Sequence, residues 1–302
     1  RDRTGAPVFV ICPDDTAAES FANDLRAMLG EGVNTLGMRD FTFYAAEAAS
    51  RQAEQKRISA LYALARGESP LTAVSVSGLL QRTLPPETLL SAAFTIDANG
   101  SYPVEDIEAA LLRCGYTKTE QVEGPGQFAR RGGILDFFSP SDHEPVRVEF
   151  WGDDIDSMGY FDVATQRRSE NIERCVILPA AETLPPLTAG GTEALCREID
   201  GFAAKYARRR GSENSAALAA TLRADADRLR GGLAMSDADR YLPAVYPMAS
   251  GADYIPADAV IVLDQPNRCA ERARDYAKQL GEDVRELQRR GQLAMSPDGF
   301  HL

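Results

Sequence analysis

A short apolar run, Val260–Leu263, ends on the polar pair Asp264 and Gln265. In nucleoside triphosphatases this position carries two carboxylates, one to orient magnesium and one to activate water. Gln265 cannot act as a base, and the sequence holds no Gly-x4-Gly-Lys-Ser/Thr loop to bind phosphates. We therefore interpret Asp264 and Gln265 as a degenerate nucleotide site. The alternative is that Asp264 caps the helix predicted after it.

Other side chains that often carry chemistry are scattered along the chain. His143 has serine and aspartate neighbours, but they share one predicted loop, where triad geometry is hard to form. The glycines at Gly124–Gly126 lack a lysine and a following helix, so a turn is predicted there. The five cysteines are far apart and predict buried reduced thiols in a cytoplasmic protein: Cys12, Cys114, Cys175, Cys196 and Cys269. We predict no catalytic residue, no metal and no cofactor.

A binding signal comes from the strand predicted over Pro145–Trp151. Its alternation turns Arg147 and Trp151 to one face, while the apolar set Val146, Val148 and Phe150 faces the core. Trp151 is the only tryptophan of the chain, and Arg131 is expected on a neighbouring strand about 5 Å away. Arginine and tryptophan dominate binding hot spots. The alternative is that other parts of the chain cover Trp151 and that local acids pair with the arginines.

The charge of the chain disfavours general binding to nucleic acid or membranes. Its formal net charge is −12 at pH 7, which repels phosphate. The longest basic run, Arg208–Arg210, falls at the predicted end of a helix, where cations offset the helix dipole. The apolar runs are far shorter than the roughly 20 residues that span a bilayer.

The element pattern predicts an α/β fold. The continuous apolar run Pro7–Cys12 is typical of a strand buried on both faces, and Leu71–Val76 and Val260–Leu263 are predicted as a second and a third buried strand. Helical patterns follow these strands. One of these helices is predicted over Ala45–Arg66. Between them, a helix near Ser101–Cys114 precedes a run of short strands with a turn at Asp162–Arg168. The predicted strands are Tyr116–Val122, Gln127–Arg130, Gly133–Phe138, Pro145–Trp151, Ile155–Phe161 and Val176–Pro179.

We therefore predict a discontinuous α/β lobe, built from residues 1–92 and 180–302, that carries an inserted β-rich α+β domain at 93–179. The two parts of the lobe have net charges of −2 each, and the inserted domain has −8. The acidic character is thus concentrated in the domain that also holds the arginine and tryptophan signal.

Two long strings, Gly126–Phe138 and Pro145–Ser157, resemble the amino-terminal, UvrB-like module of the bacterial transcription-repair coupling factors (Mfd). Three shorter segments resemble the same family less strongly, and they follow in the order in which the family has them. They are Val176–Ala180, Tyr254–Pro256 and Leu263–Pro266. The resemblance covers essentially the whole chain.

The resemblance implies a non-catalytic module of transcription-coupled nucleotide excision repair, with a helicase-like lobe that has lost its ATPase and an inserted domain that docks UvrA. It places UvrA docking on Arg131, Arg147 and Trp151, where the family usually has phenylalanine at the last position. Members of the family are ATP-dependent DNA translocases, whose contacts to RNA polymerase and DNA would lie outside this chain. The alternative is a nucleic-acid-dependent ATPase of the UvrB type.

Overall fold

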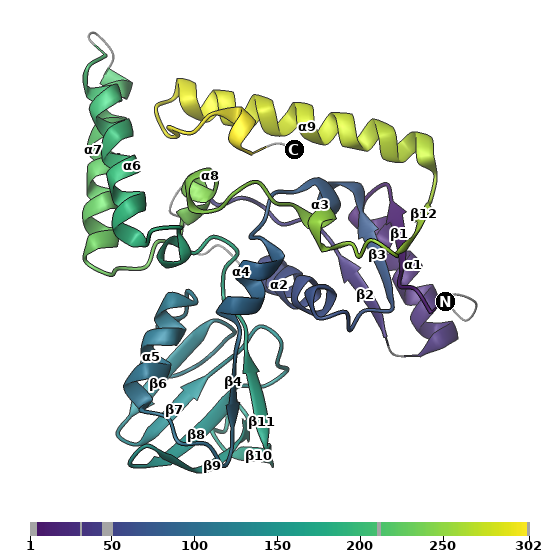
Figure 1. The fold of residues 1–302 in the computed structure, drawn as a ribbon, viewed down its shortest axis with the longest axis vertical. Helices are drawn as coiled ribbons and strands as arrows, with labels where there is room; N and C mark the ends of the chain where they lie inside the picture. The colour runs from purple at the N-terminus through teal and green to yellow at the C-terminus, as the bar shows by residue number, and fades with distance from the viewer. Residues whose placement is uncertain (1–4, 31, 44–50, 210–212, 301–302) are drawn as a thin grey trace.

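The computed structural model describes residues 5–30, 32–43, 51–209 and 213–300. A four-stranded parallel sheet has the order β12-β1-β3-β2, so that a strand from near the end of the chain lies beside the first one (Figure 1). The predicted α/β class is confirmed. The strands are β1 (Val8–Cys12), β2 (Val33–Leu36), β3 (Leu71–Ser75) and β12 (Val260–Leu263).

Helices connect these strands and cover the sheet. The helix α1 (Asp15–Leu29) begins where the Asp14 carboxylate accepts a hydrogen bond from the Ala17 backbone N–H at 2.9 Å. The helix α2 (Gln52–Ala65) buries Ile58, Leu61 and Leu64 against the core. It was predicted from Ala45, but residues 44–50 lie outside the described part of the chain. Shorter helices are α3 (Val76–Leu80), α4 (Pro86–Ala92) and α8 (Leu242–Val245).

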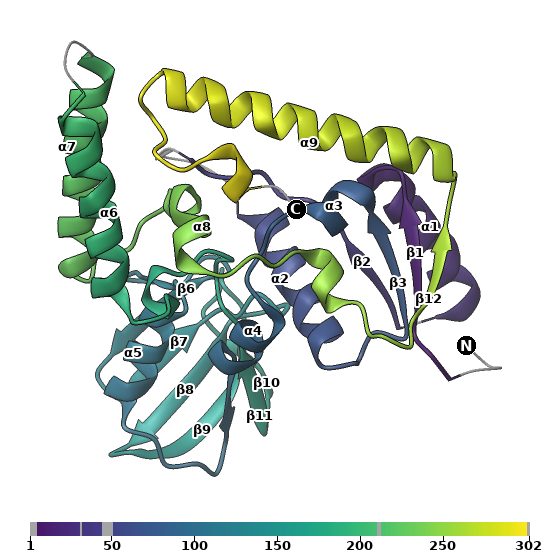
Figure 2. The ribbon, with the colours of Figure 1, turned by 45° about the horizontal axis from the view of Figure 1, so that its top comes forward.

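The prediction that β12 is buried was wrong. Its four apolar residues are between 40 and 51% exposed, because β12 is an edge strand and, among the described strands, pairs only with β1. Figure 2 shows β12 at this edge and the long helix α9 (Pro266–Arg289) starting directly beyond it. Asp264 does not cap α9 either. Gln265 occupies the cap position with φ 52° and makes no side-chain capping bond.

A second sheet has six strands in the order β10-β9-β8-β7-β6-β5, antiparallel except for the β5–β6 pair. One face packs on α5 (Val104–Arg113), which contributes Ile107 and Leu111 to a shared core. A small antiparallel pair, β4 (Phe94–Asp97) with β11 (Arg174–Ile177), lies beside it. The six strands are β5 (Thr117–Lys118), β6 (Gln127–Arg131), β7 (Ile134–Phe137), β8 (Val146–Trp151), β9 (Asp154–Phe161) and β10 (Arg168–Asn171).

Two details of this sheet differ from the sequence prediction. The strand predicted over Tyr116–Val122 is reduced to β5, and β10 forms where only the end of a turn was expected. The polar sequence of β10, Arg-Ser-Glu-Asn, carries no strand signal of its own, so its pairing to β9 decides its conformation.

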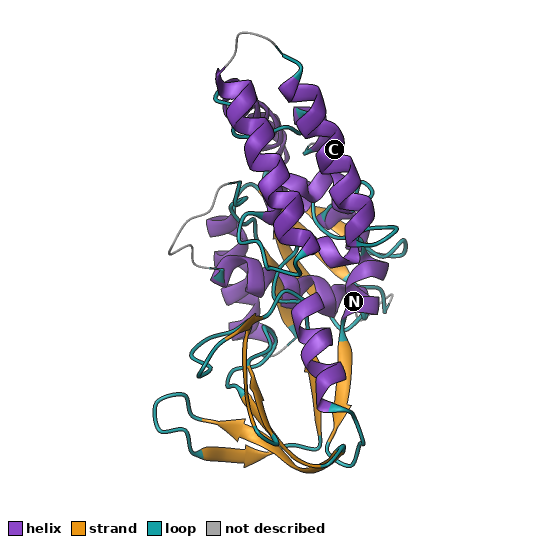
Figure 3. Cartoon of the chain, turned by 90° about the vertical axis from the view of Figure 1, so that its left-hand side faces the viewer, coloured by secondary structure: helices purple, strands orange, loops and turns teal. Residues whose placement is uncertain are grey.

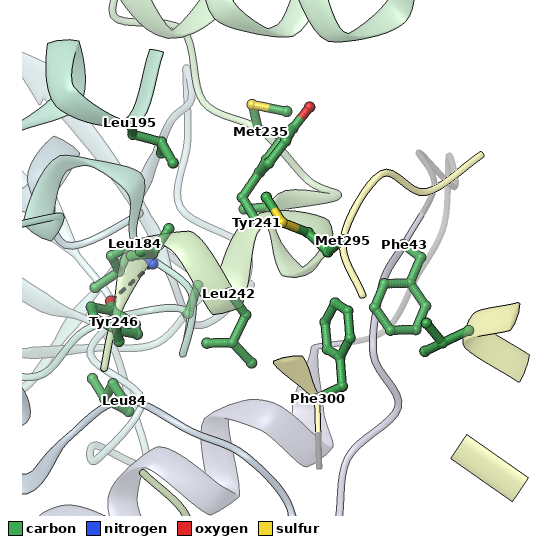
Figure 4. Close-up of a cluster of buried hydrophobic side chains, with 14 of the residues drawn as sticks. Phe43, Leu84, Leu184, Leu195, Met235, Tyr241, Leu242, Tyr246, Met295 and Phe300 are labelled. Carbon is green, nitrogen blue, oxygen red and sulfur yellow. Dashed lines mark hydrogen bonds between the residues drawn. The ribbon is translucent and has the colours of Figure 1, made fainter. Parts of the chain in front are cut away.

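The helices α6 (Thr192–Ala207) and α7 (Glu213–Arg230) pack against each other as a hairpin at the opposite end of the molecule from the antiparallel sheet (Figure 3). Residues 180–300 also contribute much of the central core. Figure 4 shows Phe43 and Leu84 among residues from this later segment, and the Tyr246 hydroxyl accepting a hydrogen bond from the Leu184 N–H at 3.0 Å.

A buried ionic network joins the same segments. The Arg39 guanidinium lies 2.6 Å from Asp239 and 3.0 Å from Glu182, and Glu182 also pairs with Arg57 at 3.2 Å. All four side chains are buried. Burial raises the pKa of Asp239, but the Arg39 charge and hydrogen bonds outweigh it and hold that pKa below its usual value. The network fixes the segment that leaves the antiparallel sheet against the α/β lobe.

Candidate protein interaction surface

The face of the six-stranded sheet that lies opposite α5 carries a cluster of charged side chains around one exposed aromatic. On β8, Val146 and Val148 are fully buried on the α5 side, as the alternation predicts. Trp151, at the end of the same strand, is 83% exposed. The alternative that other parts of the chain cover this tryptophan is therefore wrong. We call the set Arg131, Asp136, Arg147, Glu149, Trp151 and Arg168 the arginine face.

A single buried carboxylate connects the two predicted arginines. Asp136 lies directly opposite Arg147 in the β7–β8 register. Arg147 donates from Nε to Oδ1 of Asp136 at 2.7 Å and from Nη2 to Oδ2 at 2.9 Å. Arg131 donates from Nη2 to the same Oδ2 at 2.8 Å. The pairing of both arginines with a local acid, which the sequence left open, is present.

The expected spacing of Arg131 was wrong. Its strand β6 is not next to β8, because β7 lies between them. Two strand spacings separate Arg131 from Arg147, about 10 Å instead of about 5 Å. Trp151 lies four residues beyond Arg147, about 13 Å along the strand. The backbones of the three predicted residues are therefore not adjacent although they share one face, and Asp136 bridges the side chains of Arg131 and Arg147.

The two arginines have different surroundings. The Arg147 side chain is only 15% exposed. It also donates from Nη1 to the Gln166 carbonyl at 3.2 Å, and its Cζ lies 4.4 Å from the centre of the Phe161 ring. Hydrogen bonding to Asp136 raises the pKa of Arg147, so its charge is fixed. The Arg131 side chain is 49% exposed and is the more accessible cation.

A second ion pair extends the arginine face. Arg168 of β10 lies 3.4 Å from Glu149, and it also donates a hydrogen bond to the Ser157 hydroxyl at 2.8 Å. Sequence reasoning missed Arg168 because Asp162–Arg168 was interpreted as a turn. The alternation of the strand predicts Glu149 on the same face as Arg147, but only the β9–β10 pairing brings Arg168 to it.

Arg130, the neighbour of Arg131, points to the other side of the sheet. Its guanidinium pairs with Glu108 at 2.6 Å and with Glu105 at 2.8 Å, both on α5. It holds the helix to the sheet and is not part of the arginine face.

The degenerate nucleotide site predicted at Asp264 and Gln265 lies at the carboxyl end of the parallel sheet. The Asp264 N–H donates to the Ile11 carbonyl at 2.9 Å, and Gln265 accepts a bond from Arg268 at 2.7 Å. Arg268 also lies 3.7 Å from Asp14. Arg272 lies 3.8 Å from the same Asp14 carboxylate, so both arginines are paired with residues of the chain itself.

The described residues contain no cluster of three or more histidine, cysteine, aspartate or glutamate side chains that could hold a metal ion. The five cysteines are free and buried, as predicted. Burial, reinforced by the nearby Asp264 carboxylate, raises the pKa of the Cys12 thiol to about 11.

None of the described helices has the length and apolar character that a membrane span requires.

Comparison with known proteins finds a similarity in the part of the chain that carries this surface. The family model described as the UvrB interaction domain matches residues 94–182. Residues 94–182 are therefore similar to this domain, and we refer to this segment as the UvrB interaction domain. The match begins at the first residue of β4 and ends at Glu182, which enters the buried ionic network. All six residues of the arginine face lie within this UvrB interaction domain.

Curated relatives extend the similarity beyond the UvrB interaction domain. The chain is 27% identical to the transcription-repair-coupling factor of Bacillus subtilis over 298 residues, which are 97% of this chain and 25% of that protein. The factor of Myxococcus xanthus is 32% identical over 187 residues, or 59% of this chain and 16% of that protein. The factor of Escherichia coli is 29% identical over 181 residues, which are 60% of this chain and 16% of that protein. The predicted family resemblance is confirmed, and the chain spans a quarter or less of these relatives.

Proposed function

We propose that this chain is a non-catalytic interaction module of a transcription-coupled DNA repair factor, and that the arginine face of its UvrB interaction domain docks UvrA. The observation that carries the proposal is the 83% exposed Trp151 on the same sheet face as Arg131, within the matched domain. Tryptophan and arginine are the residue types that dominate binding hot spots, and here an exposed tryptophan and an accessible arginine share one sheet face.

The charges of the arginine face indicate the kind of surface that it fits. The arginine face has three arginines and two carboxylates, which is a small excess of positive charge. Residues 93–179 as a whole carry a net charge of −8. Long-range attraction to an acidic partner is therefore weak, and the contacts must act at short range. A partner carboxylate can accept two parallel hydrogen bonds from a planar guanidinium, while Trp151 supplies apolar contact area.

The organisation of the rest of the chain belongs to the same proposal. We take residues 1–92 and 180–302 as one helicase-like α/β lobe and residues 93–179 as an inserted domain. The pairing of β12 with β1, and of β11 with β4 at the base of the insert, supports this division. ATP-driven translocation on DNA and contacts to RNA polymerase would then belong to other parts of a full-length factor.

The proposal is tested by measuring the affinity of the purified chain for UvrA. We expect binding by the natural sequence, and a loss of about thirtyfold in both Arg131→Ala and Trp151→Ala, the usual effect of truncating a hot-spot residue. Arg174→Ala is the matched control, because this exposed arginine of the same domain pairs with Asp97 away from the arginine face. Absence of binding by the natural sequence, or equal losses in all three variants, would contradict the proposal.

A further inference from the structure

We propose that Asp136 is the positioning residue of the arginine face: its buried carboxylate holds the Arg131 guanidinium in the orientation that meets the partner, and Arg147 acts through it. This inference rests on the proposed function and assigns different roles to two arginines that the sequence treats alike. Asp136 contacts no partner in this scheme.

The position of Asp136 suits this role. It lies on the central strand β7 and is 1% exposed, between β6 with Arg131 and β8 with Arg147. Both of its carboxylate oxygens accept hydrogen bonds from arginine. A buried carboxylate is stable only when paired and hydrogen-bonded. Arg147 supplies two of these bonds and an opposite charge, and the Oδ2 oxygen also accepts the bond from Arg131 at the surface.

The donors of the two arginines are used differently. Arg147 commits Nε, Nη1 and Nη2 to Asp136 and Gln166 and is largely covered. Within the described residues, Arg131 donates a side-chain hydrogen bond only from Nη2. A guanidinium has five N–H donors in a fixed fork, and the Arg131 side chain is 49% exposed, so most of its donors are left for a partner. Arg131 is therefore the residue that a partner carboxylate can reach.

Holding Arg131 in advance affects affinity through entropy. A long side chain that is mobile in the free protein must be ordered on binding, which weakens binding by roughly three- to tenfold. The Asp136 hydrogen bond removes that penalty, because it restrains Arg131 before the partner arrives. Loss of Asp136 should thus weaken binding by this factor and only when Arg131 is present.

The experiment is a double-mutant cycle with UvrA. The chain is labelled with 5-fluorotryptophan, and because Trp151 is its only tryptophan, one ¹⁹F resonance reports binding and folding together. We expect Asp136→Asn to weaken binding about three- to tenfold, Arg131→Ala about thirtyfold, and the double variant no more than Arg131→Ala alone. Additive losses, or no loss in Asp136→Asn, would overturn the inference.

Two further variants separate positioning from folding. Asp97→Asn, the control, removes an acid of the same domain that pairs with the exposed Arg174, and it should bind UvrA like the natural sequence. If Asp136→Asn does not fold, the pair Asp136→Leu with Arg147→Met replaces the buried ions by apolar side chains. It leaves Arg131 unrestrained, and it should weaken binding by the same three- to tenfold. Unchanged affinity there would also overturn the inference.

A readout without UvrA distinguishes failure of this inference from failure of the proposed function. NMR of the arginine guanidinium groups should show restricted Arg131 rotation in the natural sequence and free rotation in Asp136→Asn. If the natural sequence does not bind UvrA, the proposed function fails, while this NMR result still decides whether Asp136 positions Arg131. If the Arg131 guanidinium rotates equally freely in both proteins, the positioning role is refuted, whether or not the chain binds UvrA.

Discussion

Asp136 and Arg147 face each other across the β7–β8 pair, and both carboxylate oxygens of Asp136 accept hydrogen bonds from this one guanidinium, at 2.7 and 2.9 Å. The contact makes Arg147 part of the folded framework as well as part of the arginine face. Among the described residues, none forms a hydrogen bond with the side chain of Trp151, which lies on the same strand and is 83% exposed. The two residues therefore differ in what their loss does to the fold.

Arg147→Ala should lower the free energy of unfolding by about 1–3 kcal/mol, because the buried Asp136 carboxylate loses two of its hydrogen-bond donors. Trp151→Ala should change it by no more than about 0.5 kcal/mol, as surface substitutions usually do. Urea denaturation followed by circular dichroism measures both values. The buried contact with Asp136 is what makes Arg147→Ala the more destabilising of the two changes. A lower free energy of unfolding in Trp151→Ala, together with an unchanged one in Arg147→Ala, would contradict this prediction.

The pH dependence of stability should carry a contribution from Asp142. Burial raises the pKa of this carboxyl from 3.8 to about 6, although hydrogen bonds from Cys175 and Tyr160 lower it in part. The folded protein thus holds the proton more tightly than the unfolded chain. The stabilisation is fully present below pH 3.8 and is lost as the pH rises through about 6.

Asp142→Asn tests this assignment, because the amide cannot ionise. Thermal unfolding between pH 4 and pH 7 should show a smaller loss of stability with rising pH in this variant than in the natural sequence. The matched control is Glu144→Gln, a neighbouring carboxyl on the same turn. Identical pH profiles for the natural sequence and Asp142→Asn would show that Asp142 does not titrate as described.

We expect no ATP hydrolysis above background by this chain. Gln265 stands where a second carboxylate is needed, and the sequence lacks the lysine-containing phosphate loop. Phosphate release should equal that of a buffer blank, and magnesium with ATP should not shift the melting temperature, since ligand binding would raise it. Turnover that disappears in Asp264→Ala would contradict this prediction and favour the ATPase alternative.

Duplex DNA should not bind measurably at physiological salt. The chain carries a net charge of −12, so few phosphates could be neutralised. In the basic run, Arg209 lies against the Tyr206 ring at 4.6 Å, and Arg210 is outside the described residues. Fluorescence anisotropy with a labelled duplex checks this. Micromolar binding with a steep salt dependence that Arg208→Ala weakens would refute it.

Sequence reasoning located the arginine face because the period of two in Val146–Trp151 is a local property that fixes which side chains share a face. The spacing of two strands between Arg131 and Arg147 could have been expected, because the predicted strand Gly133–Phe138 lies between theirs in the sequence. Arg168 was missed because the polar sequence of β10 carries no strand signal and becomes a strand only by pairing with β9. The exposure of β12 was missed because an apolar sequence indicates a preference for burial and says nothing about which neighbours are present to cover it.

The pairing of β12 with β1 sets an order of assembly during protein synthesis. Every strand of the six-stranded sheet lies within residues 117–171 and the β4–β11 pair within 94–177, whereas β1 acquires β12 only when residue 263 has been made. Ribosomes add about 5–20 residues per second, so the 81 residues from 182 to 263 take roughly 4–16 s. During this interval the strands of the UvrB interaction domain can pair, while β1 still presents an open sheet edge that chaperones or other nascent chains could occupy.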